Sequence, residues 1–256
     1  MPGSGRKRPV DTTRNDSIQR ADEANEFVRF LDLAGHDLRN PITVLKSQVQ
    51  LLQRRLSREE GREEDLREIG RMAYQIDRLN VGLDTFVEAA RIRQGRFQLM
   101  PDTCDLGKVM RRLATIYETA SRAHSVTFEV PGEDIVARWD TTRVELVLAA
   151  LLTNALKFTT QGDVVVRVTR EPPLARITVT DTGPGIPPGE EQTIFDEYST
   201  SSSTENSGVG LGLFVAREIV RQHGGDIGVT TPAHGGASFW FTLPLAGVPD
   251  DEHIAD

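Results

Sequence analysis

Residues 177–186 read ITVTDTGPGI, in which an alternating apolar and polar stretch leads directly into a loop with two glycines. The period of two in 177–180 predicts a half-buried strand. Gly183 and Gly185 allow the backbone to turn sharply and to approach a flat ligand. Asp181, at the end of the strand, can accept a hydrogen bond from an exocyclic amine. Taken alone, the stretch fits an ordinary loop as well as a binding site.

A second glycine-rich stretch, GVGLGL at 208–213, precedes a predicted helix that runs to His223. Its glycines leave backbone N–H groups accessible at a helix N-terminus, which favours phosphate. No predicted strand precedes this stretch, which argues against a Rossmann site. Residues 199–207 contain only Ser, Thr, Glu and Asn, a composition typical of a mobile lid. His223, followed by two glycines, is interpreted as a helix cap rather than a catalytic group.

Asn154 and Lys157 are three residues apart near the end of a predicted helix at 142–158. This spacing puts both side chains on one helix face, an oxygen ligand for Mg²⁺ beside a cation for phosphate. The alternative is an asparagine near a helix end and a solvated lysine without a ligand. Ala150, four residues earlier on the same face, has no group that activates water.

The order of the predicted elements indicates how this part of the chain is built. Strands are predicted at Val126–Val130, Ile135–Trp139, Val164–Thr169, Arg176–Thr180 and Ser238–Leu243, and helices at 105–123, 142–158 and 213–223. Strands and helices that do not alternate strictly indicate an α+β sandwich, in which one sheet carries helices on one face.

The N-terminal part has a different pattern, in which apolar residues recur every three or four positions. They run from Phe27 to Leu56 and, after a polar break around Gly61, from Leu66 to Ala90. Each run predicts an amphipathic helix of about 30 residues, roughly 45 Å long. A lone hairpin leaves each apolar seam half covered, so we expect two copies to form a four-helix bundle.

The turn Gln94-Gly95-Arg96 ends the second predicted helix and marks the boundary between the two parts. We therefore predict a multidomain chain, a long antiparallel helical hairpin followed by an α/β sandwich. Its predicted segments are a flexible lead-in at 1–21, the hairpin at 22–95, a linker at 96–104, the sandwich domain at 105–245 and an acidic tail at 246–256.

His36 lies off the apolar stripe of the first predicted helix. With Ala34 at a core position of the heptad, His36 takes the outermost position. A histidine there is ordinarily a solvated polar residue, but Pro41 interrupts the helix close by and Asp37 is adjacent. Neutral imidazole is a nucleophile, and the neighbouring carboxylate can accept its proton. Asn40, one turn further on, can orient a water molecule.

Composition narrows the possible classes of protein. There are 30 Lys and Arg against 38 Asp and Glu, a net charge of −8, which argues against a generic nucleic-acid binder. The single cysteine, Cys104, excludes an internal disulfide and a cysteine-cluster metal site. No apolar run approaches the roughly 20 residues that span a bilayer. We therefore expect a cytoplasmic protein without a membrane span.

Together these stretches resemble the sensor histidine kinases of the two-component type, with a HisKA dimerisation domain followed by a GHKL-type, or Bergerat, ATP-binding domain. The resemblance covers residues 22–245 and rests on several motifs in the order of the family. They are the H-box GHDLRNP at 35–41, the N-box LLTNALKFT at 151–159, the glycine boxes at 181–186 and 208–213, the F-box IFDEY at 194–198 and a short glycine motif GGASF at 235–239.

The resemblance implies that ATP phosphorylates His36, with Asp37 as general base. The phosphoryl group then passes to an aspartate of a response-regulator receiver domain. Asn154 would hold Mg²⁺, Lys157 would pair with phosphate, and Asp181 would bind the adenine amine. The other residues implied to bind nucleotide are Gly183, Gly185, Ile186, Phe195, Gly208, Gly210, Leu211 and Gly212.

The resemblance also implies partners and a second activity. Asp37 and Asn40 match the family's acid-x-x-Asn pattern, in which the last residue positions water to dephosphorylate the regulator. The expected partners are a second copy of the chain and the receiver domain. No recognisable sensor segment precedes Asp22, so regulation is expected to come from a separate sensory or regulatory protein, from the short N-terminus, or from a region missing from this chain.

One residue and one stretch of the chain depart from the pattern of the family. Ala150 occupies the place of a polar N-box residue, which favours phosphotransfer over ATP hydrolysis. The stretch Tyr198–Ser207 has no Arg or Lys, so the cation that many relatives aim at the γ-phosphate would come from elsewhere, for example Arg39. These departures leave open a non-catalytic histidine phosphotransfer or scaffold protein with a degenerate ATP domain. A further alternative, an ATP-driven conformational machine or serine kinase of the same superfamily, needs a hydrolytic Glu or another acceptor and leaves the His36–Asp37 pair unexplained.

Overall fold

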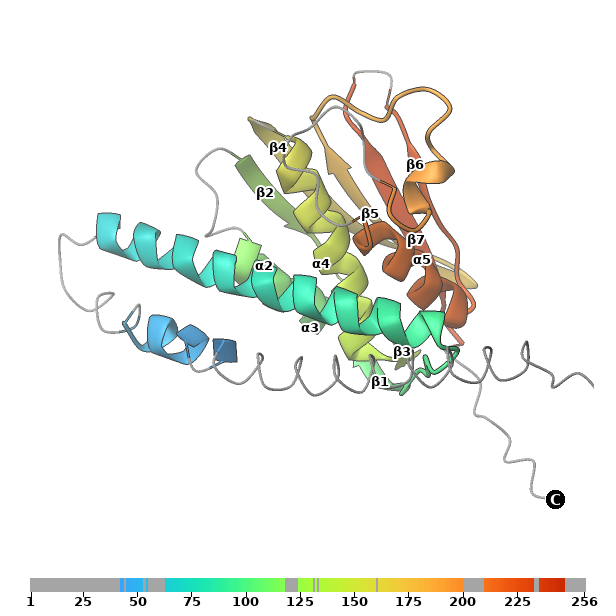
Figure 1. The fold of residues 1–256 in the computed structure, drawn as a ribbon, viewed down its shortest axis with the longest axis horizontal. Helices are drawn as coiled ribbons and strands as arrows, with labels where there is room; N and C mark the ends of the chain where they lie inside the picture. Colours follow the sequence, from blue (N-terminus) through green and yellow to red (C-terminus); the bar gives the residue numbers. More distant parts are fainter. Residues whose placement is uncertain are drawn as a thin grey trace, which may run out of the picture.

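A computed structural model shows a helical hairpin region beside a two-layer α/β sandwich (Figure 1). The residues that the structure describes are 42–43, 45–52, 54, 63–117, 124–130, 132, 134–159, 161–199, 210–232 and 235–246. The first helical stretch lies within 42–54, and the long helix α2 (Glu63–Arg93) follows it. Within the described residues no helix is both long and apolar enough to cross a membrane.

The sandwich contains a five-stranded mixed sheet in the order β2-β4-β5-β7-β6. Strands β2 and β4 are parallel, and the other neighbours are antiparallel. The strands are β2 (His124–Glu129), β4 (Gly162–Glu171), β5 (Leu174–Asp181), β6 (Ile227–Thr230) and β7 (Ser238–Pro244). The prediction of one sheet with helices on one face is confirmed.

Two short strands form a second, smaller sheet near the start of the sandwich. They are β1 (Asp102–Asp105) and β3 (Val136–Trp139), and they pair antiparallel. Strand β1 includes residues 102–104, which the sequence predicts to be a linker. Neither β1 nor β6 was predicted from the sequence.

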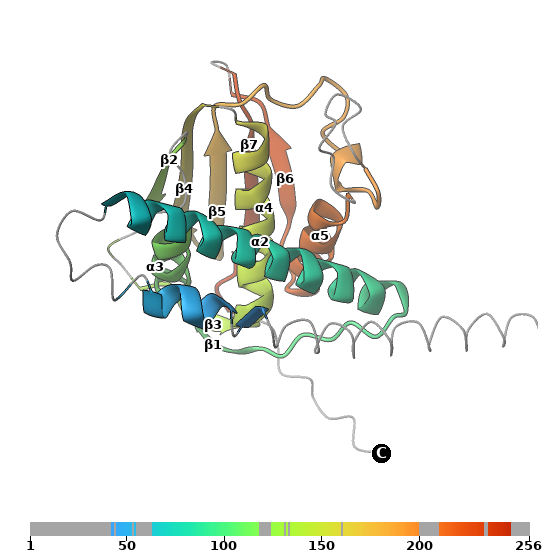
Figure 2. The same ribbon diagram turned by 60° about the vertical axis from the view of Figure 1, so that its left-hand side comes forward.

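Three helices cover one face of the large sheet: α3 (Leu106–Tyr117), α4 (Thr141–Phe158) and α5 (Gly212–Gln222) (Figures 1 and 2). Helix α3 begins directly after Asp105, whose Oδ1 atom caps the helix by accepting the N–H of Lys108 at 3.1 Å. The helix was predicted to reach residue 123. It ends at Tyr117, and residues 118–123 lie outside the described part of the chain.

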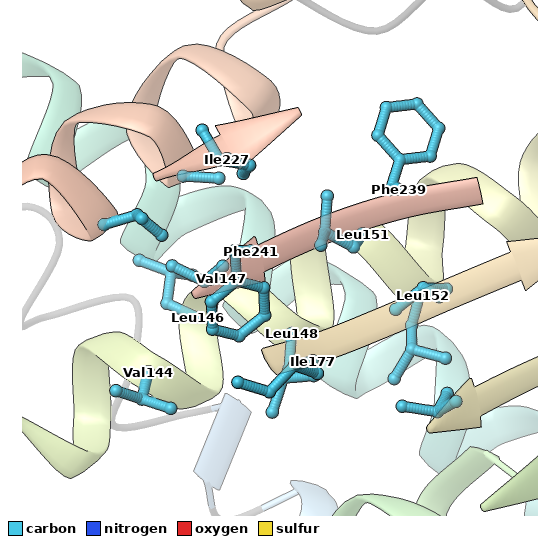
Figure 3. Packing of buried hydrophobic residues seen from close by; sticks show 14 of the residues in the cluster. Val144, Leu146, Val147, Leu148, Leu151, Leu152, Ile177, Ile227, Phe239 and Phe241 are labelled. Atoms are coloured by element: carbon cyan, nitrogen blue, oxygen red, sulfur yellow. The ribbon is translucent and has the colours of Figure 1, made fainter. Parts of the chain in front are cut away.

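The hydrophobic core lies between α4 and the sheet. Leu148, Leu151 and Leu152 of α4 are fully buried, as are Ile177, Phe239 and Phe241 on the strands opposite. Figure 3 shows these side chains between the helix and the strands. Burying a side chain of this size stabilises the fold by about 1.5–3 kcal/mol. This packing holds α4 in place on the sheet, and with it the predicted functional residues of its last turns.

Helix α2 crosses the outer surface of α4 and α5, on the side away from the sheet (Figure 2). It ends at the turn predicted from the sequence, where Gly95 has a φ of 65°. The N–H of Gly95 donates to Ile92 O at 3.0 Å, and the N–H of Arg96 donates to Arg91 O at 2.9 Å. These two bonds satisfy carbonyl groups that a helix end otherwise leaves unpaired.

Candidate nucleotide-binding site

Asp181 ends strand β5 with its side chain on the helix-covered face of the sheet and is 4% exposed. Its Oδ1 atom accepts the backbone N–H groups of Gly183 at 2.8 Å and Ala237 at 3.3 Å. Among the described residues, none donates to the other oxygen, Oδ2. Burial raises the pKa of this carboxyl, and the two N–H groups oppose that rise. A fixed, buried carboxylate with one oxygen available is a suitable acceptor for an exocyclic amine.

The loop after Asp181 is closely packed and requires glycine. A Cβ atom on Gly183 would lie 2.9 Å from Asp181 Oδ1 and 3.1 Å from Phe158 O, at the end of α4. Gly236 has a φ of 83°, and a Cβ there would lie 2.0 Å from Asp181 O. Close approach of these backbones keeps Asp181 in position. The close approach of Gly183 to Phe158 O places the end of α4 directly beside the loop.

The last turns of α4 carry the predicted ligands for metal and phosphate. Asn154 is half-buried and Lys157 is exposed, three residues further along the same helix face. The ammonium of Lys157 lies 4.6 Å from the centre of the Phe158 ring. Partial burial, and secondarily the positive charge of Arg78, lower the pKa of Lys157. The amide oxygen of Asn154 is a hard ligand of the kind that Mg²⁺ takes in proteins.

The second glycine stretch approaches the F-box through backbone contacts. Tyr198 donates its N–H to Gly210 O at 3.1 Å, and a Cβ on Gly210, whose φ is 72°, would lie 2.8 Å from Tyr198 C. Gly212 begins α5 and faces Ala150 of α4, where a Cβ would lie 3.9 Å from the alanine methyl. The small residue at 150 therefore lies against the start of α5.

Other predicted nucleotide-binding residues surround this region. Phe195 belongs to the short helix η1 (Thr193–Phe195) and is buried, with its ring 6.3 Å from that of Phe239 at 75°. Leu211 is buried as well, and Ile186 is half-buried. The described geometry gives Phe195 a packing role beneath the site, and its contact with nucleotide stays a prediction.

The predicted phosphoacceptor group lies outside the described residues. This applies to His36, Asp37 and Asn40, to the candidate cation Arg39, and to Gly208 of the second glycine box. The structure therefore brings together Asn154, Lys157, Asp181 and the described glycines. No group of three or more potential metal-ligating His, Cys, Asp or Glu side chains occurs within the described part of the chain.

Sequence reasoning missed a polar connection between helix α2 and the sandwich. Glu88 of α2 is 8% exposed and lies 3.3 Å from Arg143 of α4. Arg143 also pairs at 2.7 Å with Asp140, the N-cap of α4. At the end of α2, Arg93 contacts both Glu197 at 3.2 Å and the hydroxyl of Tyr198 at 3.1 Å. No periodicity signals such pairs, because their partners are remote in sequence.

A sandwich with a buried acceptor at the end of the central strand and an amide–ammonium pair on the adjoining helix has the architecture of a nucleotide-binding domain. Residues 139–247 match the family of histidine kinase-, DNA gyrase B- and HSP90-like ATPases, and residues 28–95 match the His Kinase A (phospho-acceptor) domain. The two matches together span more than half of the chain. The chain belongs to the two-component sensor histidine kinases.

Individual relatives agree with this assignment. The chain is 32% identical over 247 residues to the sensor protein KdpD of Escherichia coli, covering 94% of this chain and 27% of KdpD. It is 28% identical over 251 residues to the hybrid signal transduction histidine kinase D of Dictyostelium discoideum, covering 93% of this chain and 16% of that protein. The chain thus spans less than a third of either relative.

One solved structure covers both parts of the chain. Full-length ShkA in complex with AMPPNP superposes with a TM-score of 0.58 at 23% sequence identity. The match covers 86% of this chain and 46% of that one. At this identity the likeness concerns the fold, a helical region followed by an α/β sandwich.

Proposed function

We propose that this chain binds Mg²⁺ and ATP at the end of the central strand β5, transfers the γ-phosphoryl group to His36, and passes it to an aspartate of a response-regulator receiver domain. The observation that carries the proposal is the buried Asp181, whose Oδ1 is held by two backbone N–H groups while Oδ2 is left for a ligand. An adenine amine matches that acceptor. The family match of residues 28–95 supports a phosphoacceptor histidine upstream.

Phosphoryl transfer depends on positioning and on neutralising charge. In the proposed reaction an imidazole nitrogen of His36 attacks the γ-phosphorus, a P–N bond forms, and the P–O bond to ADP breaks. Asp37 accepts the proton of the other ring nitrogen. Asn154 fits Mg²⁺ through its amide oxygen, and the metal, when bound, offsets charge on the phosphates. Lys157 supplies a positive charge beside it.

We propose that two copies of the chain associate through helix α2. Met72, Leu79 and Phe86 are seven residues apart and are 50%, 62% and 39% exposed. Side chains at this spacing form a continuous stripe, as in helical bundles. Large exposed apolar stripes of this kind are covered in most proteins by a partner. A second copy covers it with the same stripe, in a four-helix bundle.

The residues of the proposed nucleotide site favour the kinase over the degenerate scaffold. A scaffold has no need of the buried acceptor of Asp181, the Asn154–Lys157 pair and the close backbone packing at Gly183. All of these are present in the described structure. We propose that a separate sensory or regulatory protein controls the kinase.

The test is incubation of the purified chain with Mg²⁺ and γ-labelled ATP, beside His36→Gln and the control His253→Gln. We expect acid-labile, alkali-stable label on the wild type and the control, and none on His36→Gln. All three chains are expected to bind ATP equally. Label that persists on His36→Gln would refute the assignment of the acceptor. No ATP binding at millimolar concentration would refute the kinase.

A further inference from the structure

The end of helix α2 contacts the sandwich directly after η1. Arg93 is the last residue of α2, and its Nε atom lies 3.2 Å from Glu197 Oε1. Its Nη1 atom donates to the hydroxyl of Tyr198 at 3.1 Å, and its guanidinium carbon lies 5.7 Å from the centre of the Tyr198 ring. One guanidinium of the hairpin therefore holds two neighbouring residues of the sandwich.

The carboxylate of Glu197 requires a nearby positive charge. Its Oε1 atom is shielded from solvent and accepts no hydrogen bond from any described residue. Removing a carboxylate oxygen from water is costly unless another charge compensates. Arg93 supplies that charge across the boundary between the two parts of the chain.

Tyr198 has a backbone conformation that needs support from its surroundings. Its φ is 62°, and it is the one residue other than glycine with a positive φ in the described part of the chain. This region is disfavoured for a residue with a Cβ atom. The residue is 52% exposed, so packing in the core does not hold it. The described polar contact of its side chain is the hydrogen bond from Arg93.

The backbone of Tyr198 in turn contacts the second glycine stretch. Its N–H donates to Gly210 O at 3.1 Å. A Cβ on Gly210, whose φ is 72°, would lie only 2.8 Å from Tyr198 C. Because these two backbones touch, a change in the conformation of Tyr198 moves Gly210. Helix α5 begins two residues later, at Gly212.

Residues 196–198 are also held from the side of the sandwich. Arg217 of α5 donates to Asp196 Oδ1 at 3.1 Å. The short segment 196–198 thus lies between an arginine of α5 and an arginine of α2, two helices that are themselves in contact (Figure 2). The position of α2 on the sandwich is transmitted to the start of α5 through this segment.

We infer that Arg93 is a positioning residue for the phosphates of ATP, which acts from helix α2 through Tyr198 on Gly210. The inference rests on the proposed function, since it takes the second glycine stretch to lie against the phosphates. Arg93 itself touches no phosphate. It keeps Tyr198 in its left-handed conformation, and that conformation keeps the backbone of the glycine stretch in place for the ligand.

Arg93 thereby links ATP binding to the docking of α2, which belongs to the region that matches the phosphoacceptor domain. If docked α2 strengthens ATP binding, bound ATP must strengthen the docking of α2 by the same factor. Adenosine has no phosphate to place against Gly210. Its affinity should therefore not depend on Arg93.

The experiment is calorimetric titration of the full chain with Mg·ATP and with adenosine. We compare wild type, Arg93→Gln, Arg93→Lys and the control Arg96→Gln, which removes a charge from an exposed position in the turn after α2. Exposed ion pairs and cation–π contacts are weak, so ATP affinity should fall about three- to tenfold in Arg93→Gln. Adenosine affinity should stay unchanged, and Arg93→Lys should recover part of the loss.

A double-mutant cycle tests the route through Tyr198. Glycine adopts a positive φ freely, so the backbone of Tyr198→Gly needs no support from Arg93. Adding Arg93→Gln to Tyr198→Gly should therefore change ATP affinity less than about twofold. The same loss in this background as in the wild-type background would show that Arg93 does not act through Tyr198.

Three other results would overturn the inference while leaving the proposed function standing. The first is unchanged ATP affinity in Arg93→Gln. The second is an equal loss for adenosine, because a general disturbance of the sandwich weakens both ligands together. The third is an equal loss in Arg96→Gln, which would indicate an effect of overall charge. If the wild type does not bind ATP at all, the proposed function fails, and this inference fails with it.

Discussion

The imidazole of His223 joins two helices of the sandwich, because its Nε2 atom accepts the backbone N–H of Asp140 at 3.0 Å. Its Nδ1 atom donates to Ile219 O at 2.8 Å, a pairing that sets the tautomer. Asp140 caps α4 and pairs with Arg143, which in turn reaches Glu88 of α2. A single polar chain thus connects α5, α4 and α2, and His223 has the structural role predicted for it.

Replacing His223 by leucine should destabilise the chain by about 1–3 kcal/mol, because the N–H of Asp140 loses its buried partner. Burial lowers the pKa of His223 below its ordinary value near 6.5. The stability that the neutral ring contributes is therefore present above pH 6.5 and is lost as the pH falls through the folded-state pKa.

Denaturant unfolding at pH 7.5 and at pH 5 measures both effects. The wild type should lose stability between these values, and His223→Leu should lack that component. His253→Leu serves as a matched control and should behave as wild type. A pH dependence of the same size in His223→Leu would show that another group is responsible.

Asp181→Asn should separate ligand binding from stability. The amide keeps an acceptor for Gly183 and Ala237 but presents an NH₂ donor where Oδ2 accepted, so ATP affinity should fall at least about tenfold. Burial raises the pKa of Asp181 in the folded state, so the ionised carboxylate costs stability as the pH rises through that pKa. The ligand-free variant should therefore melt at the same temperature as wild type or higher at pH 7.

Thermal melts with and without Mg·ATP test this prediction. ATP should raise the melting temperature of the wild type and leave that of Asp181→Asn nearly unchanged. The difference between the ligand-free proteins should shrink as the pH falls below the folded-state pKa of Asp181, because the buried carboxyl then takes up its proton. An undiminished ATP-induced rise in the variant would contradict the assigned role of Asp181.

Asn154→Ala should remove the part of ATP affinity that depends on Mg²⁺, because the amide oxygen is the proposed metal ligand. We expect Mg²⁺ to strengthen ATP binding by the wild type about tenfold or more, and to change binding by the variant little. Titrations with Mg²⁺ and with a chelator measure the difference. Thr127→Ala, on the outer strand β2, is the control and should keep the full metal effect. The same metal dependence in both variants would exclude Asn154 as a ligand.

Leu79→Glu should break the proposed dimer. Leu79 lies at the centre of the exposed stripe formed with Met72 and Phe86, and burying a leucine there contributes about 1.5–3 kcal/mol. A buried unpaired carboxylate adds a further cost, so the dimer should dissociate at least tenfold more readily. Sedimentation over a concentration series measures this, with Thr127→Glu as the control for added charge. An unaltered dimer would place the interface on another face of the hairpin.

Local patterns predicted most of the sandwich. The alternation in 177–180 and in 164–169 identified β5 and β4, because one side of each strand is buried beneath helices. The four-residue strands β1 and β6 carry too little alternation to be detected, and their pairing with β3 and β7 is what makes them strands. The predicted end of helix α3 at residue 123 stays a prediction, because the described part of the helix stops at Tyr117.

The amino-acid sequence alone determined which motifs of a histidine kinase are present and which residue types form its site. Glycines, a carboxylate and the spacing of an amide and an ammonium group are local features of a sequence. Only the tertiary structure decided that Ala237 donates to Asp181, that Ala150 faces the start of α5, and that Glu88 of α2 pairs with Arg143 of α4. These contacts join residues tens of positions apart. They form through packing of the core and docking of α2, which no local pattern encodes.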